Sequence, residues 1–108
     1  MDYIFETAQN RKHLLYSVGE HIVMRRIQAD MISRPIYISH NYKESLSAVL
    51  YSDIIYYTYV TTIGDIEFRS TASEKPLLLI NHSDSIIYLM KRFRLLILKL
   101  LLFLVLTA

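Results

Sequence analysis

The hydrophobic run at the C-terminus constrains the fold of this chain more than any other feature. Residues 95–108 have the sequence LLILKLLLFLVLTA, in which Lys99 is the only charged side chain. The basic cluster Lys91-Arg92-Phe93-Arg94 stands directly before this run. A segment so rich in leucine is stable only where most of its side chains leave water. The sequence therefore predicts that the C-terminus lies against lipid or against a partner protein.

The distribution of charge along this segment favours lipid. On a helical wheel all four cations of residues 86–108 fall on one side, which is typical of a helix lying at a bilayer surface. From Leu100 onward the helix is apolar all round. From residue 95 to the end it reaches about 21 Å, which is less than the roughly 30 Å of a hydrocarbon core, so that spanning is marginal. We expect a C-terminal membrane-associating or transmembrane helix over residues 86–108.

This expectation specifies a partner, a location and a set of residues. The partner is the lipid bilayer, and the rest of the chain lies on the cytoplasmic side because basic residues flank the apolar run. The residues expected to associate with the membrane are Lys91, Arg92, Arg94, Leu95, Leu96, Ile97, Lys99, Leu100, Leu101, Leu102, Phe103 and Leu104.

The N-terminal third has apolar residues at a helical period. They fall on one stripe at 100° per residue, which predicts an amphipathic helix over about residues 2–33. Gly19 interrupts this helix, and Pro35 ends it because the residue before a proline disfavours the helical conformation. The residues of the stripe are Ile4, Ala8, Leu15, Val18, Ile22 and Ala29.

The middle of the chain predicts strands. Residues 53–62, DIIYYTYVTT, are almost all β-branched or aromatic, and residues 66–70 alternate between apolar and charged. Gly64 between them supplies the positive φ of a hairpin turn. A further short strand is expected at residues 36–39. With the N-terminal helix, these strands predict a small α+β body over residues 1–85, followed by the C-terminal helix at 86–108.

No constellation in the sequence predicts catalysis or a cofactor. The chain has no cysteine, and its two glycines are too few for a phosphate-binding loop. His13 and His21, placed on the predicted helix, are too far around it to share a metal ion. We therefore expect a protein that is not an enzyme and that has no catalytic, cofactor-binding or metal site.

One stretch resembles a known family. Residues 36–71, with the sequence SDIIYYTYV followed by a hairpin, resemble the early strands of the LytTR type of DNA-binding domain. That resemblance implies a regulatory module. The His- and Arg-rich segment that contacts DNA in that family is replaced here by a polar loop and the hydrophobic run. No binding residue is carried over, and we expect no nucleic acid partner.

Four hypotheses for the function remain open at this point. The first is a small non-enzymatic protein attached to a membrane by its C-terminal helix. The second is a soluble protein-interaction or regulatory module whose leucine-rich tail packs on a partner, and the third is a membrane-active, peptide-like protein. The composition, rich in Ile, Leu and Tyr and without Trp, also fits a little-selected open reading frame with no function.

Overall fold

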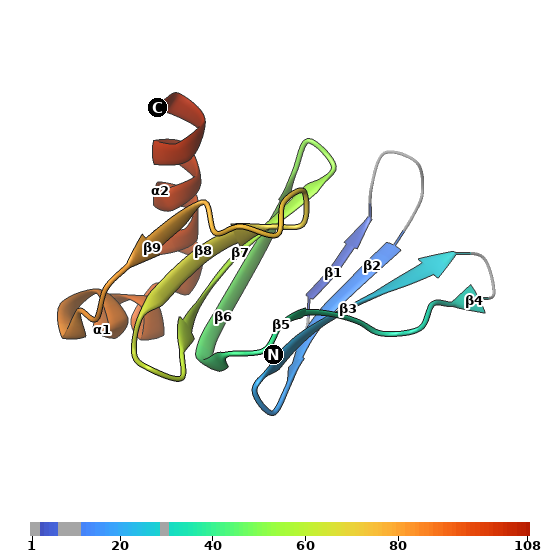
Figure 1. Ribbon diagram of the computed structural model, residues 1–108. Helices are drawn as coiled ribbons and strands as arrows, with labels where there is room; N and C mark the ends of the chain where they lie inside the picture. Colours follow the sequence, from blue (N-terminus) through green and yellow to red (C-terminus); the bar gives the residue numbers. More distant parts are fainter. Residues whose placement is uncertain (1–2, 7–11, 29–30) are drawn as a thin grey trace. The chain divides into compact units, whose positions relative to one another are not determined.

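The chain folds into two compact units, residues 1–42 and residues 43–108. The structure is a computed structural model that describes residues 3–6, 12–28 and 31–108 (Figure 1). The described part is mostly strand, arranged in two antiparallel sheets, with two helices at the C-terminal end. Each unit contains one of the sheets and is described by itself below.

The first unit is a five-stranded sheet. Its strands follow the order β1-β2-β3-β4, and β5 also pairs with β3, so that β3 is the centre of the sheet. All of these pairings are antiparallel. The strands are β1 (Tyr3–Glu6), β2 (Lys12–Val18), β3 (His21–Gln28), β4 (Met31–Ile32) and β5 (Ile36–Ser39).

The amphipathic helix predicted for residues 2–33 is wrong, because this segment forms strands. Gly19 does not interrupt a helix; it has a φ of +57° and stands in the turn that joins β2 to β3. The hairpin buries Leu15 and Ile22, two members of the predicted helical stripe. A spacing of seven residues suits a helix face, but it also suits two strands folded back on each other. Ala8 and Ala29, two other members of the stripe, lie outside the described residues.

The second unit combines a four-stranded sheet with both helices. The sheet has the order β6-β7-β8-β9, so neighbours in sequence are neighbours in space. Figure 1 shows α1 and α2 beside this sheet. The elements are β6 (Tyr42–Tyr51), β7 (Ile54–Thr61), β8 (Ile66–Ser70), β9 (Leu78–Ile80), α1 (Asp84–Arg92) and α2 (Arg94–Thr107).

Local sequence explains the turn and the helix start in this unit. Strands β7 and β8 lie where the sequence predicts them, and Gly64 in the turn between them has a φ of +86°. Helix α1 begins after Ser83, whose hydroxyl accepts a hydrogen bond from the backbone N–H of Ile86. The helix expected over residues 86–108 is two helices, because Phe93, with φ −131° and ψ 50°, leaves the helical conformation.

The core of the second unit lies between the sheet and the two helices. Tyr56 and Phe68, on neighbouring strands, pack against Leu98, Leu101 and Leu102 of α2. A second cluster joins Val60 and Ile66 of the sheet to Met90 of α1. Helix α2 supplies three of the five buried residues of the first cluster, and burying one such side chain contributes about 1.5–3 kcal/mol.

Candidate functional site

Helix α2 has one face against the sheet and one face exposed. The buried residues Leu98, Leu101 and Leu102 follow the helical spacing i, i+3, i+4. The opposite side is apolar as well, apart from one lysine. We call this exposed side the outer face of α2, and it consists of Leu95, Leu96, Lys99, Leu100, Phe103 and Leu104.

The outer face gathers exposed apolar side chains on one helix. Its five apolar side chains, which span three turns of one helix, are between 50% and 63% exposed. Apolar surface concentrated in one patch usually marks an interaction site, whereas single exposed leucines need no explanation. This face is the candidate functional site of the second unit.

The residues predicted to associate with a membrane are thus divided between two roles. Leu101 and Leu102 belong to the core, and Ile97 is half-buried against both apolar clusters. Leu95, Leu96, Leu100, Phe103 and Leu104 are exposed. Sequence hydrophobicity could not separate these two groups, because the same residue type occupies both faces.

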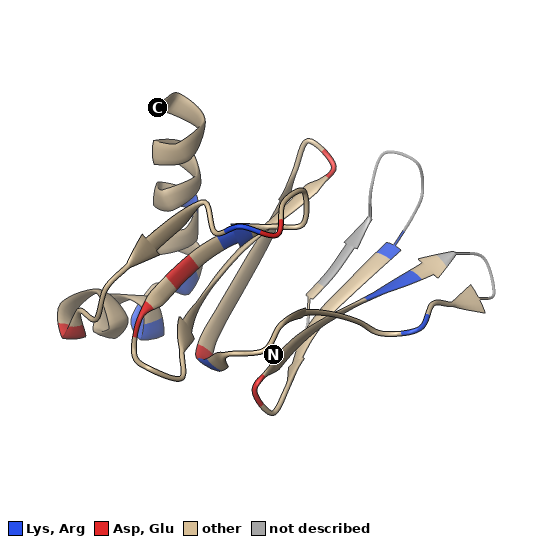
Figure 2. Ribbon diagram, viewed as in Figure 1, with Lys and Arg blue, Asp and Glu red and all other residues tan. Residues whose placement is uncertain are grey.

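The basic cluster is partly engaged within the protein. The Lys91 ammonium lies 3.0 Å from a carboxylate oxygen of Glu44 on β6. Arg92 donates a hydrogen bond of 3.3 Å to the hydroxyl of Tyr88, and its guanidinium lies 5.9 Å from the centre of the Phe93 ring. Arg94 begins α2, and Lys99 is exposed within the outer face. No acidic side chain occurs between residues 85 and 108, so after Asp84 the two helices carry basic charges only (Figure 2).

The structure corrects the membrane prediction. Within the part of the chain that the structure describes, no helix has both the length and the apolar composition that a bilayer crossing requires. Helix α2 has 14 residues, and the bend at Phe93 separates it from α1. The predicted transmembrane helix, and the membrane localisation that depended on it, are therefore not supported. The buried side of α2 instead covers a sheet.

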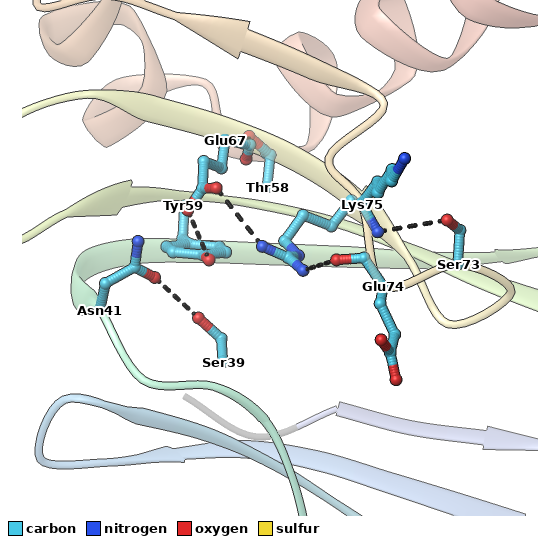
Figure 3. A network of polar contacts seen from close by, with 9 residues as sticks. Ser39, Asn41, Thr58, Tyr59, Glu67, Ser73, Glu74 and Lys75 are labelled. Carbon is cyan, nitrogen blue, oxygen red and sulfur yellow. Dashed lines mark hydrogen bonds and ion pairs between the residues drawn. The ribbon is translucent and has the colours of Figure 1, made fainter.

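The opposite face of the same sheet carries a polar network. The Tyr59 hydroxyl donates a hydrogen bond of 2.8 Å to one carboxylate oxygen of Glu67, as Figure 3 shows. The other oxygen of Glu67 accepts one of 3.3 Å from Arg69, which also donates to the backbone carbonyl of Glu74. The Tyr57 and Tyr59 rings stack, with centroids 6.2 Å apart. This network ties β7 and β8 to the loop that follows β8.

Burial and neighbouring charges shift the pKa values of this network in opposite directions. Burial raises the pKa of Tyr57, and the neighbouring Arg69 opposes this by favouring the phenolate. Burial alone would lower the pKa of Arg69, but the adjacent Tyr57, Tyr59 and Glu67 raise it above its ordinary value. The neutral phenol and the charged guanidinium are therefore both stabilised. These contacts join the neighbouring strands β7 and β8, which is a structural role.

The predicted N-terminal helix would carry His21 together with His13, but that helix does not form. The histidine that lies close to His21 is His40, which follows strand β5. Only the pairing of β3 with β5 brings these two residues together, and no local sequence signal could have predicted it. Among the described residues there is no group of three or more His, Cys, Asp or Glu side chains placed to hold a metal ion.

Comparison with known proteins identifies no relative. No protein-family model matches the chain, and neither the curated proteins nor the solved structures give a significant match. The resemblance of residues 36–71 to the LytTR type of domain therefore receives no support from a family match.

Proposed function

We propose that this chain is a non-enzymatic protein-interaction module whose docking surface is the outer face of α2. The occupant we propose is an amphipathic helix of a partner protein that carries carboxylates beside its apolar stripe. The single observation that supports this function is the patch of five apolar side chains, at least half exposed, on a helix whose other side is anchored in the core.

The spacing of the patch favours a helical partner. Leu96, Leu100 and Phe103 follow one another at intervals of four and three residues, which is the spacing of a coiled-coil seam. The 14 residues of α2 extend about 21 Å, which matches four turns of a partner helix. Because α2 is packed on the sheet through Leu98, Leu101 and Leu102, the helix would lose little conformational freedom when a partner binds.

The positive charge of the outer face determines which kind of partner helix fits it. Lys99 lies within the outer face and Arg92 stands near its N-terminal end, while residues 85–108 contain no acidic side chain. A partner with carboxylates flanking its apolar stripe complements these cations, and it would associate faster at low salt. A second copy of this chain fits less well, because pairing two outer faces would place one cationic surface against the other.

The test uses a designed helical peptide as a probe. The peptide has leucine at heptad positions a and d and glutamate at e and g, and its matched control has lysine in place of each glutamate. We expect the full-length protein to bind the glutamate peptide, measured by fluorescence anisotropy, and to lose affinity as salt is raised. Equal affinity for the two peptides would contradict the proposed partner.

Three variants and two further measurements sharpen this test. Leu100→Gln should weaken binding of the glutamate peptide, whereas Ile63→Gln, which changes a side chain that is 78% exposed in the turn after β7, should leave binding unchanged. Lys99→Glu should shift the preference toward the lysine peptide. Light scattering that shows a dimer formed through α2, or sedimentation with phosphatidylglycerol vesicles without peptide binding, would each overturn the proposal.

A further inference from the structure

Two histidines meet at one end of the five-stranded sheet. The Nδ1 atoms of His21 and His40 lie 3.0 Å apart, and the two rings are almost perpendicular, at 83°. Tyr37 lies against both rings, edge to face with His21 and stacked on His40. All three residues belong to the first unit, and none of them forms part of the α2 site.

The backbone fixes the two histidines on both sides. Next to them in the sheet, Ile22 of β3 is paired with Ser39 of β5. Beyond them, the backbone N–H of Tyr42 donates a hydrogen bond of 2.9 Å to the carbonyl of Glu20. The strand ends that carry the rings are therefore held in register, and the short distance between the rings follows from the topology of the sheet.

We propose that His21 and His40 form a two-histidine site for a divalent transition-metal ion, with Cu²⁺ as the preferred ion. Neutral imidazole nitrogens are the ligands that copper, nickel and zinc share. The two Nδ1 atoms share a hydrogen bond in this structure, so metal binding would replace it, with the shared proton moved to an Nε2 atom or released and both Nδ1 lone pairs turned toward one ion. Water would complete the coordination, since no third His, Asp or Glu joins this pair within the described ranges.

The distance between the nitrogens selects among these ions. With metal–nitrogen bonds of about 2.0–2.1 Å, two nitrogens 3.0 Å apart subtend roughly 90–97° at the metal. That is the angle between adjacent ligands in the tetragonal sites of Cu²⁺ and Ni²⁺, whereas the tetrahedral sites typical of Zn²⁺ need about 109°. Of the two tetragonal ions, Cu²⁺ forms the more stable complexes.

The test is a titration of the full-length protein with CuCl₂, followed by calorimetry and electron paramagnetic resonance. We expect a one-to-one complex whose spectrum shows hyperfine coupling to two nitrogens. Either His21→Asn or His40→Asn should leave coupling to one nitrogen and weaken binding roughly tenfold or more, because the advantage of two linked ligands is lost. Circular dichroism of each variant checks that the strands are retained.

His82→Asn is the matched control. His82 is in the other unit, where its ring nitrogens lie 3.2 Å from the carbonyl of Gly64 and 2.9 Å from a carboxylate oxygen of Asp84. Its replacement should leave Cu²⁺ affinity unchanged. No one-to-one complex with the parent protein, or equal affinity in the parent, His21→Asn and His40→Asn, would overturn the proposal.

Discussion

The two sides of α2 are made of the same kind of residue and yet have opposite surroundings. Leu98 is fully buried against Tyr56 and Phe68, whereas Leu100, two positions away, is 52% exposed. The helix period explains the difference, because two residues correspond to 200° of rotation about the axis. The buried side stabilises the second unit, and the exposed side is available for a partner. Hydrophobicity alone therefore does not determine the role of a residue in this helix.

The largest expected effect concerns the sheet side of the buried contact. Phe68 is 1% exposed and packs against Leu98, Leu101 and Leu102, so Phe68→Ala should lower the free energy of unfolding by about 3–5 kcal/mol. Urea denaturation followed by circular dichroism measures this loss. A change below 1 kcal/mol, a value typical of surface positions, would show that α2 is not packed on β8.

A smaller loss is expected on the other face of the same sheet. Glu67→Gln removes the charge that Arg69 faces while it keeps the shape of the side chain, and it should cost about 1–3 kcal/mol. Tyr59→Phe removes the other hydrogen bond to Glu67 and should cost less, about 1 kcal/mol. A double-mutant cycle measures their coupling. Strict additivity of the two changes would contradict a connected network.

The turn between β7 and β8 should tolerate little change. Gly64 has a φ of +86°, and a Cβ at this position would lie 2.5 Å from Nδ1 of His82. Gly64→Val should therefore destabilise the protein by about 1–3 kcal/mol, through backbone strain and the displacement of His82. Gly19→Val is the matched comparison, because its φ is also positive but no atom lies within 4 Å. The denaturation midpoint should fall further for Gly64→Val.

The smallest expected effect is a change in the alkaline titration of the tyrosine side chains. Burial raises the pKa of Tyr57 above 10.0, so the folded state favours the neutral phenol. The contribution to stability is complete below pH 10 and is lost as the pH rises through the higher, folded-state pKa. Tyr57→Phe should remove a phenol that ionises above the ordinary tyrosine range in an absorbance titration of the folded protein. A titration curve that loses an early phenol instead would contradict the burial of Tyr57.

The sequence predicted local features of the second unit better than those of the first. Gly64, with β-branched and aromatic residues on both sides, predicts the β7–β8 hairpin from local preferences alone. In the first unit, Leu15, Val18 and Ile22 fit a helical period as well as a hairpin, so periodicity predicts a helix where the structure has two strands. Gly19 makes the turn with its positive φ, but in the sequence it is equally compatible with an interrupted helix.

The candidate sites could be predicted only in part. The exposed leucines of α2 were expected to contact a membrane, a prediction that the structure contradicts, and their division from the buried ones depends on how the helix lies on the sheet. The pairing of His21 with His40 depends on the β3–β5 ladder, which joins residues far apart in the sequence. Non-local pairings of this kind leave no periodic signal in a single sequence.

A direct comparison of Leu98→Ala with Leu100→Ala tests the central claim that α2 has a structural side and a docking side. Both changes remove the same atoms from the same helix. We expect the free energy of unfolding of the full-length protein to fall by about 2–5 kcal/mol for Leu98→Ala. For Leu100→Ala it should change by no more than about 0.5 kcal/mol. Equal losses for the two variants would contradict the claim.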